Sequence, residues 1–139
     1  MDFRVGWLAV VVMPFTYTID REREAVFYSA TGGLTDEIAQ DLHSKIFQDP
    51  DFHPDLRVLG DYCGVSELQI SAATIASLAA RSGFSKQSRR ALLTQYGIIS
   101  GTALFYTQNT PLGNVRIFYD RAKALAWLNE GVPPEKVIT

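Results

Sequence analysis

Residues 15–31 read FTYTIDREREAVFYSAT and decide the fold class of the chain. Alternating residues of β-branched and aromatic type at Phe15–Ile19, and again at Ala25–Thr31, predict two strands. The charged residues Asp20–Glu24 between them predict a short polar turn. We therefore expect an antiparallel hairpin at the start of the domain.

A helix is predicted directly after the hairpin. Gly32 and Gly33 are expected to end the second strand, and Thr35 is the predicted N-cap of the helix. Two acidic residues follow in the first turn, where negative charge favours the helix dipole. An apolar residue recurs every four positions and predicts one buried stripe, formed by Ile38, Leu42 and Ile46.

Strands and helices alternate through the rest of the chain. In order, we expect a strand at Leu56–Tyr62, a helix capped by Ser71 and ended by Gly83, a strand at Arg90–Thr94, a helix at Tyr96–Tyr106, a strand at Val115–Tyr119 and a last helix capped by Asp120. The inner side of that last helix is expected to carry Ala122, Leu125, Ala126 and Leu128. Alternation of this kind implies parallel pairing with right-handed crossovers. The sequence thus predicts an α/β domain with a mixed sheet of about five strands and about four helices.

Composition excludes several classes of protein. The chain has 139 residues, 47% of them hydrophobic and 20% charged, which is typical of one compact domain. A formal net charge of −2 argues against a dedicated nucleic-acid binder. The longest apolar run, Val5–Met13, is too short to span a membrane. A single cysteine, Cys63, excludes an internal disulfide and a multi-cysteine zinc site.

The domain is expected to cover residues 13–130, with a C-terminal tail at 131–139. Residues 1–12 are expected to be an appendage or a mis-assigned start, because Met13 offers an alternative start just before the hairpin. The open alternative is that Val5–Val12 forms an extra strand at a sheet edge.

Charge is spread unevenly along the chain. Residues 1–70 carry 5 basic and 12 acidic side chains, whereas residues 71–139 carry 8 and 3. This asymmetry produces a two-faced surface that selects a partner, or it disappears when folding interleaves the two halves. A basic stretch at Arg81, Lys86, Arg89 and Arg90 is more typical of a solvated surface than of an anion site.

Neither catalysis nor metal binding is indicated. His43 and His53 lie away from the expected strand ends, and acidic neighbours of Cys63 oppose a reactive thiolate, so we expect this cysteine to serve in packing. Acidic residues and His53 alternate in the loop at 49–55, but two prolines and the lack of a central glycine exclude an EF-hand. We expect no catalytic residue, no cofactor and no metal.

Four segments carry a family resemblance: MPFTYTID at 13–20, YSATGGLTD at 28–36, YGI at 96–98 and VRIFYDRAKALAWL at 115–128. Together they resemble the STAS domain superfamily, in its SpoIIAA-like branch of small bacterial proteins similar to anti-sigma factor antagonists. The last segment is the most specific, because such proteins typically close with a strand, an acidic cap and an Ala-Trp-Leu helix. The resemblance spans about residues 13–128 and implies a STAS/SpoIIAA-like fold.

The resemblance also implies a function. It points to a cytoplasmic, non-enzymatic regulatory module that binds a protein partner, such as a kinase or an anti-sigma-like protein. The alternative is a carrier or sensor of a small hydrophobic ligand, as in the structurally similar CRAL-TRIO lipid carriers. We expect neither nucleic-acid binding nor a transmembrane segment, and a homodimer stays an open alternative.

Two sets of candidate site residues follow. The regulatory members carry a phosphorylated serine where the second helix begins; Ser71 falls at that place, although the preceding acid and the following glycine are absent. The candidate partner-binding or phospho-switch residues are Ser71, Ser66 and Asp61. The candidate ligand pocket comprises Tyr62, Tyr96, Gly97 and Gly101. We expect Ser71→Asp to keep the helix cap, and hence the stability, while adding a permanent charge.

Overall fold

The computed structural model describes residues 14–95 and 114–139. A single sheet with the strand order β1-β2-β3-β4-β5 forms its framework. The strands are β1 (Phe15–Asp20), β2 (Ala25–Thr35), β3 (Arg57–Gln69), β4 (Arg90–Leu93) and β5 (Val115–Phe118). β1 and β2 are antiparallel, whereas β2 to β5 run parallel to one another. The predicted hairpin and the predicted mixed sheet of five strands are confirmed.

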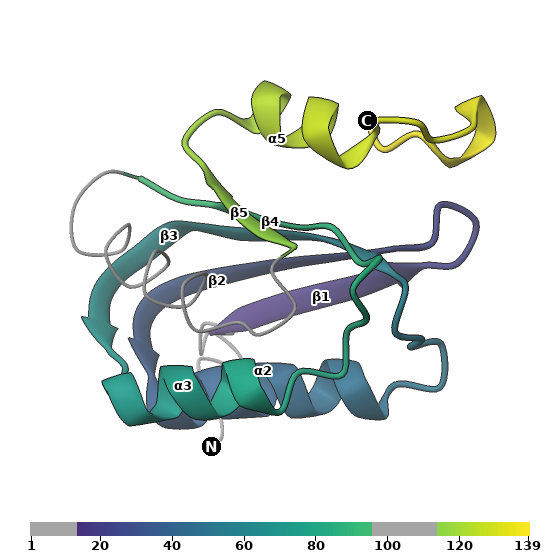
Figure 1. Cartoon of the computed structure of the whole chain (residues 1–139). Coiled ribbons are helices and arrows are strands. Elements are labelled where there is room, and N and C mark those ends of the chain that lie inside the picture. Colours follow the sequence, from purple (N-terminus) through teal and green to yellow (C-terminus); the bar gives the residue numbers. More distant parts are fainter. Residues whose placement is uncertain (1–13, 96–113) are drawn as a thin grey trace, which may run out of the picture.

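Helices cover both faces of this sheet. The described residues form α2 (Asp36–Gln48), α3 (Ala72–Ala80), α5 (Arg121–Leu128) and a short 3-10 turn, η1 (Pro134–Lys136). α2 and α3 lie on one face and α5 lies on the other (Figure 1). The predicted helix at Tyr96–Tyr106 and the predicted appendage at 1–12 lie outside the described residues, so the described part contains three of the roughly four predicted α-helices.

Two strands are longer than predicted. β2 does not stop at the glycine pair but continues to Thr35, because Gly32 adopts a φ of 74° and the strand absorbs the irregularity as a shift in register. β3 was predicted to end at Tyr62 and instead continues to Gln69, still in parallel register with β2. The sequence did not predict this extension, because its residues are mostly exposed and partly polar and so lack the apolar pattern of a buried strand.

The predicted helix starts agree with the structure better than the predicted helix ends do. The Thr35 side chain accepts a hydrogen bond from the N–H of Ile38, and the Asp120 side chain accepts one from Ala122, so both predicted N-caps are confirmed. α3 ends at Ala80 rather than at Gly83. Gly83 instead faces the aromatic core: a Cβ atom at this position would lie 3.3 Å from the Phe47 ring and 3.4 Å from the Phe52 ring, so a larger residue would crowd these rings.

Each face of the sheet has its own core because side chains alternate along every strand. The core on the α2 side contains Phe15, Val26, Tyr28, Leu42, Ile46, Leu56, Val58 and Phe84. The core on the α5 side contains Ala25, Leu59, Ala91, Leu93, Ala124, Trp127, Leu128 and Ile138. Residue 138 belongs to the stretch that we assigned to a C-terminal tail, and its side chain is only 2% exposed.

The buried face of α5 differs from the prediction. Ala124, Trp127 and Leu128 are buried, whereas Ala122 and Ala126 are exposed. The buried residues are spaced i, i+3 and i+4, which forms one stripe, and the two exposed alanines fall on the opposite arc. In this orientation the Trp127 ring packs against the ring of Phe118 on β5, with the two ring centroids 5.6 Å apart.

Gly60 of β3 tests the packing beneath the sheet. Its register partner on β2 is Tyr28, and a Cβ atom at position 60 would overlap the Tyr28 ring. We predict that Gly60→Ala lowers the free energy of unfolding by about 1–3 kcal/mol, the usual cost of overpacking a core. Urea unfolding measures the change.

Gly33→Ala is the matched control. The atom nearest to a Cβ at that position is Gln69 Oε1 at 3.9 Å, so the new methyl group has room. Its stability should equal that of the wild type or exceed it by up to about 1 kcal/mol, because alanine restricts the unfolded chain. Equal stability of the two variants would contradict the contact between Gly60 and Tyr28.

Candidate functional site

The amino ends of α2 and α3 lie side by side at one end of the sheet. This arrangement follows from the parallel pairing of β2 with β3, whose last register pair is Thr35 with Gln69. The carboxylate of Asp36 accepts hydrogen bonds from the backbone N–H of Ser71 at 2.7 Å and from its hydroxyl at 3.1 Å. Ser71 Oγ accepts in turn from the N–H of Thr74, so Ser71 is confirmed as the N-cap of α3. The Asp36–Ser71 contact therefore ties the start of one helix to the start of the next.

The charge of Asp36 suits both helices. The hydrogen bond from the Ser71 backbone holds the pKa of Asp36 below its ordinary value of 3.8, and the Ser71 hydroxyl adds to this effect. The ionised carboxylate is thus present at neutral pH, where it interacts favourably with the positive ends of the helix dipoles. Sequence analysis missed the role of Asp36 toward α3, because no local spacing links residues that lie 35 positions apart.

The contact changes the expectation for Ser71→Asp. We expected this substitution to keep stability near that of the wild type, because aspartate is a good N-cap. The structure places the Asp36 carboxylate within hydrogen-bond distance of residue 71, so the variant would bring two negative charges together and lose the hydroxyl donor. A phosphoryl group at Ser71 would meet the same repulsion.

The other two candidates for the partner surface lie at different places on β3. Ser66 is exposed and is the extra residue of a bulge, between Val65 and Glu67, in the part of β3 that leads to α3. Asp61 lies farther back along the strand, where its Oδ1 accepts a hydrogen bond from the N–H of Cys63 at 2.8 Å. Ser66 thus belongs to the same end of β3 as Ser71, and Asp61 does not.

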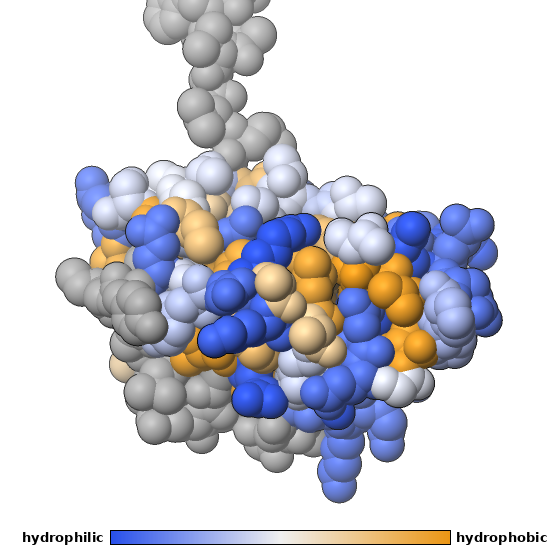
Figure 2. All heavy atoms as spheres, turned by 90° about the horizontal axis from the view of Figure 1, so that it is seen from above, coloured by the Kyte–Doolittle hydropathy of each residue, from blue (hydrophilic) through white to orange (hydrophobic). Residues whose placement is uncertain are grey.

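Asp61 instead borders an open hollow of about 210 Å³ on the α5 side of the sheet. The hollow is lined by Thr16, Tyr17, Thr18, Phe27, Tyr28, Ser29, Leu59, Asp61 and Arg121. Figure 2 views this side of the molecule and shows apolar and charged side chains interspersed, not gathered into one broad apolar area. Such a mixed surface does not select a hydrophobic ligand.

Tyr62, a predicted pocket residue, pairs with Tyr28 of the neighbouring strand. Its hydroxyl lies 2.7 Å from the hydroxyl of Tyr28, and the two rings meet edge to face with centroids 5.7 Å apart. A narrow hollow next to Tyr28 has a volume of about 20 Å³, which is room for about one water molecule. The other predicted pocket residues, Tyr96, Gly97 and Gly101, lie outside the described residues.

The basic stretch after α3 is divided between different surroundings. The Arg89 guanidinium donates to the Trp127 carbonyl at 2.6 Å and pairs with Glu130 at 2.8 Å, next to α5. Arg90 is only 2% exposed and packs over the ring of Phe84, in the core on the α2 side. Arg89, just before β4, and Arg90, the first residue of β4, thus serve opposite faces of the sheet, so these two arginines do not form a common anion site.

Cys63 lies in a setting that disfavours the thiolate. Burial raises the pKa of its thiol above the ordinary value, and the hydrogen bond and charge of Asp61 raise it further. The side chain packs against the core on the α5 side. Its surroundings therefore fit the packing role that we expected.

The acidic loop makes its contacts with protein groups. Asp49 accepts from the Tyr17 hydroxyl at 2.7 Å and from the N–H of Asp51 at 2.9 Å, and Asp55 accepts from the Ser85 hydroxyl. In residues 14–95 and 114–139, no group of three or more His, Cys, Asp or Glu side chains is arranged to hold a metal ion. Over the same ranges, no helix is long and apolar enough to cross a membrane.

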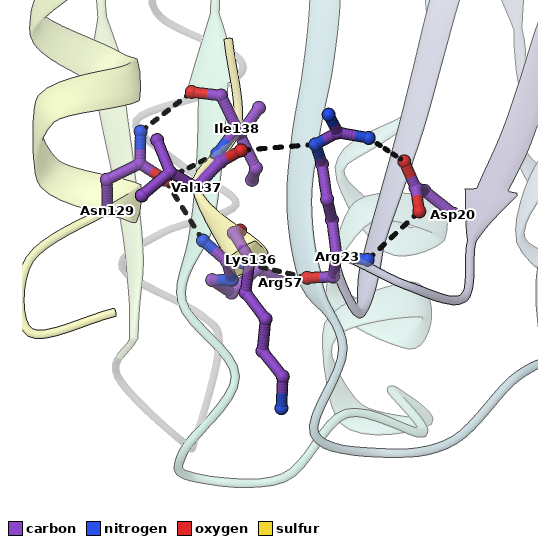
Figure 3. Close-up of polar contacts among 7 residues, drawn as sticks. All are labelled: Asp20, Arg23, Arg57, Asn129, Lys136, Val137 and Ile138. Carbon is purple, nitrogen blue, oxygen red and sulfur yellow. Dashed lines mark hydrogen bonds and ion pairs between the residues drawn. The ribbon is translucent and has the colours of Figure 1, made fainter. Parts of the chain in front are cut away.

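A second polar cluster lies at the opposite end of β3, and sequence analysis missed it entirely. The Arg57 guanidinium donates to the carbonyl oxygens of Arg23 and Lys136, each at 2.6 Å (Figure 3). It donates also to the Leu128 carbonyl at 3.1 Å. It also donates to Asn129 Oδ1 at 3.1 Å. Burial lowers the pKa of this guanidinium, but an arginine stays charged in proteins. A lone arginine at the start of a strand has no sequence signature, because its partners come from three distant segments.

Comparison with known proteins supports the fold. No family model matches the chain, and no curated protein matches it by sequence. The structure is similar to the crystal structure of an uncharacterized protein of the DUF3478 family, with a SpoIIAA-like fold, from Shewanella loihica PV-4. The two share 21% sequence identity with a TM-score of 0.59, and the match covers 84% of this chain and 95% of that one. This chain therefore has a SpoIIAA-like fold, as its sequence resemblance predicted.

Ser71→Asp tests the Asp36–Ser71 contact. We predict a lower melting temperature than that of the wild type, because two carboxylates would face each other across the helix starts. The matched control is Ser66→Asp, which adds the same charge at an exposed bulge of β3 and should leave the melting temperature nearly unchanged. Removing the facing charge with Asp36→Asn should recover part of the loss. A Ser71→Asp protein as stable as the control would contradict the contact.

His43 of α2 is a titratable side chain that lies between the helices and the sheet. Its Nδ1 donates to the Ala39 carbonyl at 2.9 Å, and its ring borders both the small cavity and an open groove between α2 and α3. Burial lowers the pKa of His43 below its ordinary value of 6.5. Arg90 and Arg81 border the same spaces, so protonation would add a further positive charge there.

We predict that stability falls as the pH drops below about 6.5, because the unfolded chain then binds a proton that the folded protein disfavours. Melting temperatures measured between about pH 7.5 and about pH 5 should fall more steeply for the wild type than for His43→Gln, which cannot titrate in this range. Parallel curves for the two proteins would show that His43 is not the group responsible.

Proposed function

We propose that this protein is a non-enzymatic, regulatory protein-interaction module whose partner surface centres on the Asp36–Ser71 contact. The observation that carries this proposal is the direct bond between the exposed Ser71 hydroxyl and an ionised carboxylate at two adjacent helix starts. The SpoIIAA-like fold supports it, because the sequence resemblance links that fold to partner switching. On this view the protein acts by binding and releasing a partner protein.

The contact suits a switch because it has two incompatible states. With the free hydroxyl, Asp36 and Ser71 hold the first turns of α2 and α3 together. A phosphoryl group on Ser71 carries about −1.5 to −2 charges and would compete with Asp36 for the Ser71 N–H. Separation of the two helix starts would change the surface that a partner meets, and an exposed serine is accessible to a kinase.

The second candidate, carriage of a small hydrophobic ligand, has less support from the described residues. Ligand sites typically have volumes of about 300–1,000 Å³ and are mostly apolar. Three hollows lined by described residues measure about 20, 250 and 210 Å³, and each includes a charged side chain or a histidine. Carriage therefore stays a prediction that depends on Tyr62, Tyr96, Gly97 and Gly101.

Affinity capture from the native host tests the proposal. Wild-type protein, Ser71→Asp and Lys123→Glu serve as baits, each loaded at an equal amount of folded protein as judged by circular dichroism. Lys123 is exposed on α5, on the opposite face of the sheet from α2 and α3, so it controls for a change of charge elsewhere. We expect wild type and Lys123→Glu to capture the same partner and Ser71→Asp to lose it.

Two outcomes would contradict the proposal. Equal capture by all three baits would place the partner surface away from Ser71. The other is a lipid bound in stoichiometric amount, detected by native mass spectrometry of the protein purified from its host. That result would favour ligand carriage.

A further inference from the structure

Four side chains near the amino end of β3 bind the segment Lys136–Ile138. We call this set the seat: it comprises Arg23, Glu24, Arg57 and Asn129. Two hydrogen bonds join Asn129 to the backbone of Ile138: the N–H of Ile138 donates to Oδ1, and Nδ2 donates to the Ile138 carbonyl, each at 2.8 Å (Figure 3). Arg23 Nε donates to the Val137 carbonyl at 3.1 Å, and Arg57 donates to the Lys136 carbonyl at 2.6 Å. The seat thus bonds the backbone of three successive residues, of which Lys136 ends the η1 turn and Val137 begins an extended stretch.

Two side chains of the segment add selectivity. Ile138 is 2% exposed and packs in the core on the α5 side, so the seat includes an aliphatic pocket. The Lys136 ammonium pairs with Glu24 at 3.0 Å, so the seat also attracts a basic residue two positions before the aliphatic one. Backbone bonds for affinity with pockets for alternate side chains are the usual basis of recognition of extended peptides.

Side chains, not a strand ladder, hold the segment in place. The three residues belong to none of the five strands, and beyond the η1 turn their backbone bonds go to the side chains just named. The segment joins α5 through Gly131, which has a φ of 71°, and a pair of exposed prolines. One buried side chain and a short glycine-proline connection favour local opening without unfolding of the sheet.

We propose that this seat is a docking site for a segment of a partner protein that leaves a turn and becomes extended, with the pattern basic residue, any residue, aliphatic residue. Residues 136–138 of the chain are its resting occupant. The partner therefore competes with them, and binding releases the segment. This surface lies at the opposite end of β3 from Ser71, so it does not depend on the function proposed above.

A peptide competition experiment tests the proposal. The probe is a fluorescently labelled peptide with the sequence of residues 132–139, titrated into the full-length protein and followed by anisotropy. Ile138→Ala weakens the resting occupant and leaves the seat intact, so this variant should bind the probe about tenfold more tightly than the wild type does. Adding Asn129→Ala to that variant should abolish binding, as should an alanine in place of the isoleucine in the probe.

Three outcomes would overturn the proposal. The first is that folded Ile138→Ala shows no saturable binding, and the second is that Asn129→Ala leaves binding unchanged. The third is a wild-type dimer that the peptide dissociates, because the occupant would then be a second copy of this chain. Ser71→Asp should bind the probe as the wild type does, so failure here is distinct from failure of the proposed function.

Hydrogen exchange of the wild-type protein keeps the test valid if Ile138→Ala does not fold. The N–H of Ile138 should exchange at least about tenfold faster than that of Val26 in the core of β2, because the segment opens locally. Exchange of both amides at the same slow rate would show that the segment opens only with global unfolding and would overturn the proposal.

Discussion

Parallel pairing of β2 with β3 is the constraint on which the rest of the structure depends. The register runs from Ala25 with Arg57 to Thr35 with Gln69, with two irregularities that the strands absorb. Parallel strands require a crossover, and α2 supplies it on the same face that α3 covers. Both helices that follow these strands must then begin at the same end of the sheet. The pairing thus determines where the polar residues meet, although most of its own stability comes from apolar side chains on the two faces.

Each end of this strand pair carries one of the two polar clusters. At the carboxyl ends, Asp36 and Ser71 join the starts of α2 and α3 in an exposed position. At the amino ends, Arg57 joins the β1–β2 turn, the end of α5 and the segment after it. The first cluster suits a response to a change of charge at Ser71. The second suits binding of the backbone of a peptide segment. The two proposals therefore assign separate tasks to opposite ends of one pair of strands.

Sequence reasoning succeeded where the physical cause is local. Caps such as Thr35 and Ser71 depend on the bonds of a side chain to a nearby N–H, so they were predicted correctly. Gly32 was misread as a break, because a glycine that ends a strand and a glycine that bends one look alike in sequence. The Asp36–Ser71 contact and the bonds of Arg57 join residues that lie 34 to 79 positions apart, and only the topology brings them together.

The central claim is that modification of Ser71 is felt by both helix starts through Asp36. Nuclear magnetic resonance of the protein carrying phosphoserine at position 71 tests it most directly, with the unmodified protein as reference. The account predicts that the pKa of the Asp36 carboxyl, held below 3.8 in the unmodified protein, rises on phosphorylation and that amide signals shift in the first turns of both α2 and α3. An unchanged Asp36 pKa, with shifts confined to the first turn of α3, would contradict it.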